Sequence, residues 1–255
     1  MTKLSVNLNK IAVVRNSRGG KRPSVTDAAR TIIAAGAHGI TVHPRPDQRH
    51  ITPEDVYDLH RLLQEFPEVE YNIEGNPSAP PRDGYPGFDA LIEQTLPTQA
   101  TLVPDSDDQL TSDHGWDLRE PNPALKERIE RYQSMGVRVS LFMDPDPDQI
   151  ARAKEHGTDR IELYTGPYAE CVWTNGDSAE KTSAVLAQYL DAARYASQLG
   201  LGVNAGHDLD LVNLSIFCRD GDIQEVSIGH ALISDALEFG LFETTRKYLA
   251  LLPSD

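Results

Sequence analysis

The stretch that decides the fold is Gly39-Ile40-Thr41-Val42-His43-Pro44-Arg45-Pro46-Asp47-Gln48-Arg49-His50. A short β-rich run ends in a histidine and a basic loop, and an amphipathic segment follows. The same order recurs along the 255-residue chain, with strands expected at 4–8, 39–43, 70–74, 101–103, 137–142, 160–164, 202–204 and 225–228. Eight such units predict a parallel sheet closed into a (β/α)₈ TIM barrel of the α/β class; an open doubly wound sheet is the alternative.

The segments between these strands have helical patterns. Helices are expected at 24–35, 53–66, 123–135, 147–156, 179–199, 209–217 and 231–252. Thr52-Pro53 and Asn122-Pro123 each place a capping side chain before a proline at the first helical position. The open sheet is disfavoured because the first strand-to-helix turn lacks G-x-G-x-x-G, and no G-x-x-x-x-G-K-[ST] occurs. We expect a single barrel domain over residues 1–255, with extended loops after strands three and four at 75–87 and 105–121.

Composition narrows the functional classes. The formal net charge of −15 argues against affinity for nucleic acid, which requires clustered Lys and Arg. No apolar run reaches the roughly 18 residues of a membrane span. The first thirty residues are rich in Lys and Arg, but they include a strand pattern and no apolar signal core. With Cys171 and Cys218 as its two cysteines, the chain suggests a reducing compartment, and we expect a cytoplasmic protein.

Polar residues gather where the expected strands end, which is where barrels carry their functional groups. Imidazole and half-buried carboxyl groups transfer protons near neutral pH, and guanidinium grips phosphate with two parallel hydrogen bonds. Gly206 and Gly229 permit close approach of a phosphate after strands seven and eight. The candidates are Asn7, Asn9 and Lys10, His43 with Arg45 and His50, then Glu74, Glu162, His207 and His230. Alternatively, Glu74 and Glu162 form ion pairs inside the barrel, and His207 caps a glycine turn.

Other chemistries fit the residues less well. A metal-dependent hydrolase would usually have an H-x-H pair on strand one, which is missing, so no metal site is expected. A Schiff-base aldolase needs a lysine on an inner strand, and Lys10 is the one lysine at a strand end. A Ser-His-Asp hydrolase needs a G-x-S-x-G elbow, which is also missing.

Several of these segments match a known family over nearly the whole chain. They include Val6-Asn7-Leu8, Gly39 to His43 with Arg49-His50-Ile51, Asn72-Ile73-Glu74, Val203-Asn204-Ala205-Gly206-His207 and Ile228-Gly229-His230-Ala231. The chain resembles the pyridoxine 5′-phosphate synthases, the ring-forming enzymes of the deoxyxylulose-dependent route to vitamin B6. The resemblance implies condensation of 1-deoxy-D-xylulose 5-phosphate with 3-amino-2-oxopropyl phosphate, without metal or organic cofactor. It also implies a homo-octamer built from dimers.

The resemblance further assigns roles to residues. His43 and Glu74 would accept protons, His207 would donate one, and Glu162 would stabilise a transition state. Asn7, Arg18 and the Gly229-His230 amide region would hold the aminoketone phosphate. Arg45, His50 and Thr111 would hold the deoxyxylulose phosphate.

Several positions depart from the family pattern, and three of them, Asn9, Lys10 and Asp208, stay candidates for substrate binding. Asn9-Lys10 replaces a common Asp-His, although lysine can still grip an anion. Asp208 replaces a usual glycine after His207, and its carboxylate would repel a phosphate unless it points away. Two alternatives therefore stay open: an isomerase or aldolase acting on another phosphosugar, and an inactive phosphate-binding protein.

Overall fold

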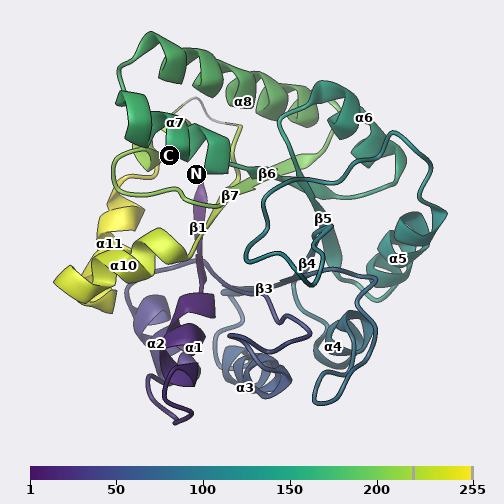
Figure 1. Ribbon diagram of the computed structural model, residues 1–255, viewed down its shortest axis with the longest axis vertical. Helices are drawn as coiled ribbons and strands as arrows, with labels where there is room; N and C mark the ends of the chain where they lie inside the picture. Colours follow the sequence, from purple (N-terminus) through teal and green to yellow (C-terminus); the bar gives the residue numbers. More distant parts are fainter. Residues whose placement is uncertain (220–221, 254–255) are drawn as a thin grey trace.

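The computed structural model describes residues 1–219 and 222–253. Eight parallel strands form a closed barrel in sequence order, with β8 paired to β1 (Figure 1). The strands are β1 Lys3–Asn7, β2 Gly39–Val42, β3 Glu70–Gly75, β4 Gln99–Leu102, β5 Arg138–Met143, β6 Arg160–Tyr164, β7 Gly202–Gly206 and β8 Glu225–Ile228. The predicted barrel is confirmed, and the open sheet is wrong.

Helices surround the barrel (Figure 1). They are α1 Asn9–Asn16, α2 Val25–Ala34, α3 Pro53–Leu63, α4 Phe88–Thr95, α5 Pro123–Ser134, α6 Pro147–Glu155, α7 Gly166–Asn175, α8 Glu180–Gln198, α9 Leu214–Cys218, α10 His230–Phe239 and α11 Leu241–Ala250. Both predicted N-caps are present, because the Thr52 and Asn122 side chains accept bonds from the backbone N–H groups of Asp55 and Leu125.

The sequence prediction missed three helices, α1, α4 and α7. Of these, α1 buries only Ile11 and Ala12 and has no side-chain N-cap. The expected tail helix at 231–252 is two helices, because Gly240 lies between them with φ +77°. The helix expected at 209–217 begins later, at Leu214.

The apolar core lies between the sheet and the helices. Side chains alternate between the two faces of a strand, so each strand has an outward and an inward set. Outward residues such as Val6 and Val42 are fully buried in one cluster with helix residues such as Ile32 and Leu59. Burial of this kind contributes about 25 cal/mol per Å² of apolar surface, and here it fixes the helices around the barrel.

The barrel interior is polar and hydrogen-bonded across strands. The hydroxyl oxygens of Ser5 and Thr41 lie 2.7 Å apart, and Thr101 donates to Asn72 Oδ1 at 3.0 Å. All four residues are buried, so these bonds offset the cost of removing polar groups from water.

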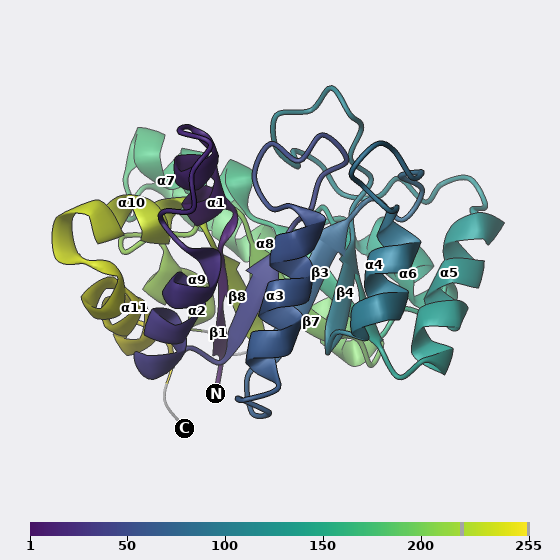
Figure 2. The same cartoon turned by 90° about the horizontal axis from the view of Figure 1, so that it is seen from below.

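The two ends of the barrel differ. Figure 2 shows the N-terminus at the lower end, whereas the long loops after β3 and β4 rise at the opposite end. All eight strands are parallel, so their carboxyl ends meet beneath these loops. Among residues 1–219 and 222–253, no helix is both long enough and apolar enough to cross a membrane.

Candidate active site

His43 follows β2 at the mouth of the barrel, and its backbone N–H donates to Asn9 Oδ1 at 2.9 Å. Its ring lies between two carboxyl groups, with Nδ1 3.8 Å from Glu74 Oε2 and Nε2 3.7 Å from Asp105 Oδ2. Burial lowers the pKa of His43 well below its usual value, and the charge of Arg45 lowers it further. The imidazole is therefore neutral at physiological pH and can accept a proton.

Glu74 ends β3 and receives a 3.4 Å hydrogen bond from Asn7 Nδ2. Its side chain is 12% exposed. Burial raises the pKa of Glu74 well above its usual value, and the nearby charges of Glu162 and Asp105 raise it further. Like charges in one small space cannot all ionise, so Glu74 holds a proton near neutral pH.

Glu162 on β6 is buried, in a row of paired polar residues that spans three strands. Register pairs join it to Asn204 on β7, and Asn204 to Glu225 on β8. Glu162 Oε2 is buried without a hydrogen-bond partner, while Asn204 donates to Glu225 Oε1 at 3.3 Å. Burial, then the Glu225 charge, raises the pKa of Glu162 to about 8. A Cβ at Gly206 would lie 2.4 Å from Glu162 Oε1, so a larger residue there would force the Glu162 carboxyl group to move.

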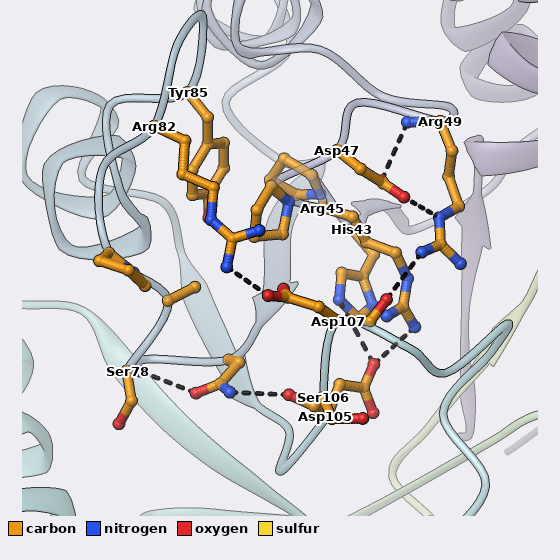
Figure 3. A pocket seen from close by; sticks show the side chains of 15 residues that line it. His43, Arg45, Asp47, Arg49, Ser78, Arg82, Tyr85, Asp105, Ser106 and Asp107 are labelled. Atoms are coloured by element: carbon orange, nitrogen blue, oxygen red, sulfur yellow. Dashed lines mark hydrogen bonds and ion pairs between the residues drawn. The ribbon is translucent and has the colours of Figure 1, made fainter.

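A cavity of about 300 Å³ lies above His43, between the loops after β2, β3 and β4 (Figure 3). Arg45 lines it and donates through Nη2 to Asp105 Oδ2 at 2.5 Å. Ser112 donates to the same oxygen at 2.8 Å, and Asn76 donates to the Asp105 carbonyl at 2.7 Å. Arg45 and Asp105 are each 5% exposed, so the cavity wall contains a buried ion pair.

Two more arginines join the loops around this cavity (Figure 3). Arg49 donates to the carbonyl oxygens of Gln109 at 2.8 Å and Asp107 at 3.2 Å, which ties the β2 loop to the β4 loop. Arg82 in the β3 loop pairs with the Asp107 carboxylate. These contacts give Arg49, which had no predicted role, a structural one.

His207 follows β7 on the other side of the mouth. Its Nδ1 lies 2.6 Å from Asp208 Oδ2, and its Nε2 lies 2.9 Å from Thr111 Oγ1 in the β4 loop. The ring packs edge-on against Tyr164, with centroids 5.1 Å apart. Thr111 thus brings the β4 loop across to the β7 side.

The sequence model of the family described as "Pyridoxal phosphate biosynthesis protein PdxJ" matches residues 4–254. The chain belongs to this family. A pyridoxine 5′-phosphate synthase from Xanthomonas campestris pv. campestris is 57% identical over 252 residues, which is 98% of this chain and 96% of the relative. One from Xylella fastidiosa is 54% identical, over 99% of this chain and 95% of the relative.

Solved structures of more distant proteins share the fold. The tryptophan synthase alpha chain from Legionella pneumophila superposes with a TM-score of 0.65 at 14% identity, over 98% of this chain and 91% of that one. A phosphoribosylanthranilate isomerase from Thermotoga maritima gives 0.55 at 14% identity, over 98% of each chain. At this identity the likeness shows a common barrel alone.

The structure brings most of the expected residues of this PdxJ family member to one end of the barrel. His50 is buried, its Nδ1 accepts the Ile51 N–H at 2.9 Å, and burial lowers its pKa to about 3. Lys10 is close enough for its charge to lower the pKa of His50 further, after that of Arg45. Gly229 packs on Asn7, because a Cβ there would lie 3.0 Å from the Asn7 Cβ.

Arg18 remains a predicted ligand whose role no contact among the described residues tests. It is exposed beyond α1, and in the described ranges its side chain has no hydrogen bond or ion pair. Two residues that act on the expected ones were missed: Asp105, which contacts His43 and Arg45, and Glu225, whose charge acts on Glu162. Asp105 lies just past β4, where the strand-end rule could have found it. Glu225 begins β8, so that rule could not.

Within residues 1–219 and 222–253, no group of three or more His, Cys, Asp and Glu side chains is arranged to hold a metal ion.

Proposed function

We propose that this protein is a pyridoxine 5′-phosphate synthase, which condenses 1-deoxy-D-xylulose 5-phosphate with 3-amino-2-oxopropyl phosphate. The products are pyridoxine 5′-phosphate, inorganic phosphate and water. The proposal is carried by the placement of the His43 ring between the carboxyl groups of Glu74 and Asp105, beside Arg45. The names of relatives 54–57% identical over nearly the whole chain support the choice of substrates.

The proposed proton transfers follow from the charge state of each group. Neutral His43 accepts a proton from the condensing substrates. Glu74 holds a proton in the free site, so it accepts another only after it has given its own away. The proposed recipient of that first proton is His43, whose Nδ1 lies 3.8 Å from Glu74 Oε2. His207 donates to a leaving oxygen. Glu162 stabilises the transition state as a buried group at the floor of the site.

The substrate phosphates are proposed to bind at two places. Arg45, His50 and Thr111 hold the phosphate of the deoxyxylulose substrate, which must compete with Asp105 for Arg45 Nη2. The aminoketone phosphate binds between β1 and β8, where a phosphate can approach the Gly229 backbone. The residues proposed there are Asn7, Arg18, Gly229 and His230. Asn9 and Lys10 are proposed to contact the deoxyxylulose phosphate, and Asp208 lies beside His207 with its carboxylate directed to that ring.

We also propose that residues 1–255 form one domain of a cytoplasmic homo-octamer, assembled as a tetramer of dimers. Leu237, Phe239 and Phe242 on α10 and α11 are exposed, and exposed apolar groups of this kind often mark subunit contacts. Light scattering during size-exclusion chromatography measures the mass directly. A particle of one or two chains contradicts the octamer.

The activity is tested with purified protein and both phosphorylated substrates, without added metal. Chromatography with fluorescence detection should reveal pyridoxine 5′-phosphate and equal amounts of released phosphate. Reactions that lack one substrate are the controls, and Glu74→Gln should lower turnover strongly. Product from a single substrate would favour an isomerase or aldolase, and no turnover at all would favour an inactive binding protein.

A further inference from the structure

The turn after β7 has an unusual backbone. His207 and Asp208 have φ values of +89° and +61°, in the left-handed region that favours glycine. Among the described residues that are not glycine, the others with positive φ are Gln48 and Leu96, and neither is next to a second one. Residues other than glycine keep such φ values only where the surrounding structure holds them, and such residues cluster at functional sites.

Two buried side chains hold this turn. The Thr165 hydroxyl lies 2.7 Å from the Gly206 carbonyl and 2.5 Å from the His207 carbonyl, to which it donates. Asn213 donates through Nδ2 to the Asp208 carbonyl at 3.2 Å. Both Thr165 and Asn213 are fully buried. The turn is therefore fixed in the conformation that brings the side chains of His207 and Asp208 together.

The two side chains meet in a short hydrogen bond of 2.6 Å between His207 Nδ1 and Asp208 Oδ2. The hydrogen bond from His207 lowers the pKa of Asp208, and the charges of His207, His230 on α10 and Lys10 on α1 lower it further. Asp208 is thus an ionised acceptor, so Nδ1 must carry the proton. The other ring nitrogen, Nε2, then faces Thr111 at 2.9 Å.

We propose that Asp208 is a positioning residue for His207. Its carboxylate keeps the proton on Nδ1, orients the ring so that Nε2 faces the barrel mouth, and stabilises the imidazolium that donates from Nε2. The inference rests on the proposed function, in which His207 is the proton donor. Tyr164 on β6 packs against the His207 ring, and the charges of Asp208 and of Asp113 in the β4 loop both act on Tyr164. Glycine would adopt the Asp208 backbone with less strain, so the carboxylate itself is what aspartate adds here.

The test compares Asp208→Gly with Asp208→Asn. Nitrogen-15 NMR of the histidines, assigned with His207→Gln, reports which ring nitrogen carries the proton in the free protein. In Asp208→Gly we expect the Nδ1-protonated tautomer of His207 to be no longer the dominant neutral form. We expect Asp208→Asn to keep that tautomer, since its amide oxygen still accepts the hydrogen bond from Nδ1. In both variants kcat should fall about tenfold or more.

Leu96→Gly is the matched control, because it relieves a positive φ of +43° at an exposed residue outside the site. Asp208→Gly and Leu96→Gly should both melt at the same or a higher temperature than the parent, whereas only Asp208→Gly should change the His207 spectrum. An unchanged His207 tautomer in Asp208→Gly would overturn the inference. The NMR measurement needs no substrate, so it decides the pairing even if the parent makes no product and the proposed function fails.

Discussion

His43 and His207 occupy two sides of one barrel mouth and are held in opposite ways. The His43 side chain is 7% exposed, and its nearest carboxylate oxygens lie at 3.7 and 3.8 Å, beyond hydrogen-bond distance. The His207 side chain is 22% exposed, and both of its ring nitrogens have partners within 3 Å. Burial without a bonded partner favours a neutral imidazole at His43, whereas His207 is hydrogen-bonded to the Asp208 carboxylate. These two settings suit the roles proposed above, proton acceptor for His43 and proton donor for His207.

The surroundings of the two histidines also differ in how buried charge is balanced. On the side of β2 to β4, the loops carry arginines, and each is paired with a carboxylate or with carbonyl groups. On the side of β6 to β8, Glu162 has a buried oxygen without a hydrogen-bond partner, and Glu162 and Glu225 both have raised pKa values. Ion pairs balance the charge of the loop arginines on the first side, whereas bound protons neutralise buried carboxyl groups inside the barrel, which include Glu74 on β3 as well as Glu162 and Glu225.

The largest effect on activity is expected from replacing His43, the proposed proton acceptor. His43→Asn keeps a polar side chain of similar size but cannot take a proton, so kcat should fall by about 10²- to 10⁴-fold. Steady-state kinetics from pH 5 to 9 measures this, with circular dichroism as the control for folding. A fall of less than about fivefold would show that His43 is not the acceptor and would remove the contrast with His207.

The next effect tests the buried ion pair beside His43. Asp105→Asn leaves the Arg45 guanidinium buried and without its counter-charge, and breaking such a pair costs about 3 kcal/mol or more. We expect the variant to melt at a lower temperature than the parent. We also expect inorganic phosphate to raise the melting temperature of the variant more than that of the parent. The anion can replace Asp105 on Arg45, and binding to the folded state raises its stability. If phosphate raises the melting temperature of the variant and of the parent equally, the ion does not bind at Arg45.

The sequence predicted the barrel well because its signals are local. Each strand is short and β-rich, and proline and capping residues mark helices such as α3 and α5. The missed helix α1 has no such cap and buries only two side chains. Its helical form depends on packing against α2 and α10, which no local pattern contains.

The site was predicted in part for a related reason. Residues at the carboxyl ends of strands, such as His43 and Glu74, follow from strand positions alone. The partners that affect their charge do not follow from strand positions. Asp105 was expected only as the start of the long loop at 105–121, and Glu225 lies at the end of its strand that is remote from the barrel mouth. The pairing of Thr111 with His207 depends on the path of a long loop, which sequence spacing cannot give.

A smaller effect is expected in the pH dependence of stability. Burial, and then the Glu70 charge, raises the pKa of Glu225 to about 7, compared with about 4.3 in an unfolded chain. The folded protein therefore binds an extra proton in this window, and stability falls as pH rises from about 5 to 7, by up to about 1.4 kcal/mol per pH unit for each such proton.

Glu225→Gln should flatten this slope in urea titrations made between pH 5 and 8. Glu65→Gln is the control, because Glu65 is exposed and the hydrogen bond from Arg30 lowers its pKa. It is ionised throughout this window, so its loss should leave the slope unchanged. A Glu225→Gln slope equal to that of the parent would mean that Glu225 is ionised in the folded protein. The balance by bound protons on the β6 to β8 side would then be wrong.

The smallest effect concerns the loops above His43. The Arg82–Asp107 pair joins the β3 and β4 loops, but its side chains are 41% and 54% exposed, and exposed pairs contribute about 0–1 kcal/mol. Arg82→Ala should therefore change the free energy of unfolding in urea by less than about 1 kcal/mol, and less again in 0.5 M salt. Arg61→Ala, which removes an exposed pair on α3, is the matched control. If Arg82→Ala lowers the free energy of unfolding as much as Asp105→Asn does, the Arg82–Asp107 pair is coupled to the buried Arg45–Asp105 pair. The network of ion pairs on the β2 to β4 side would then extend to the protein surface.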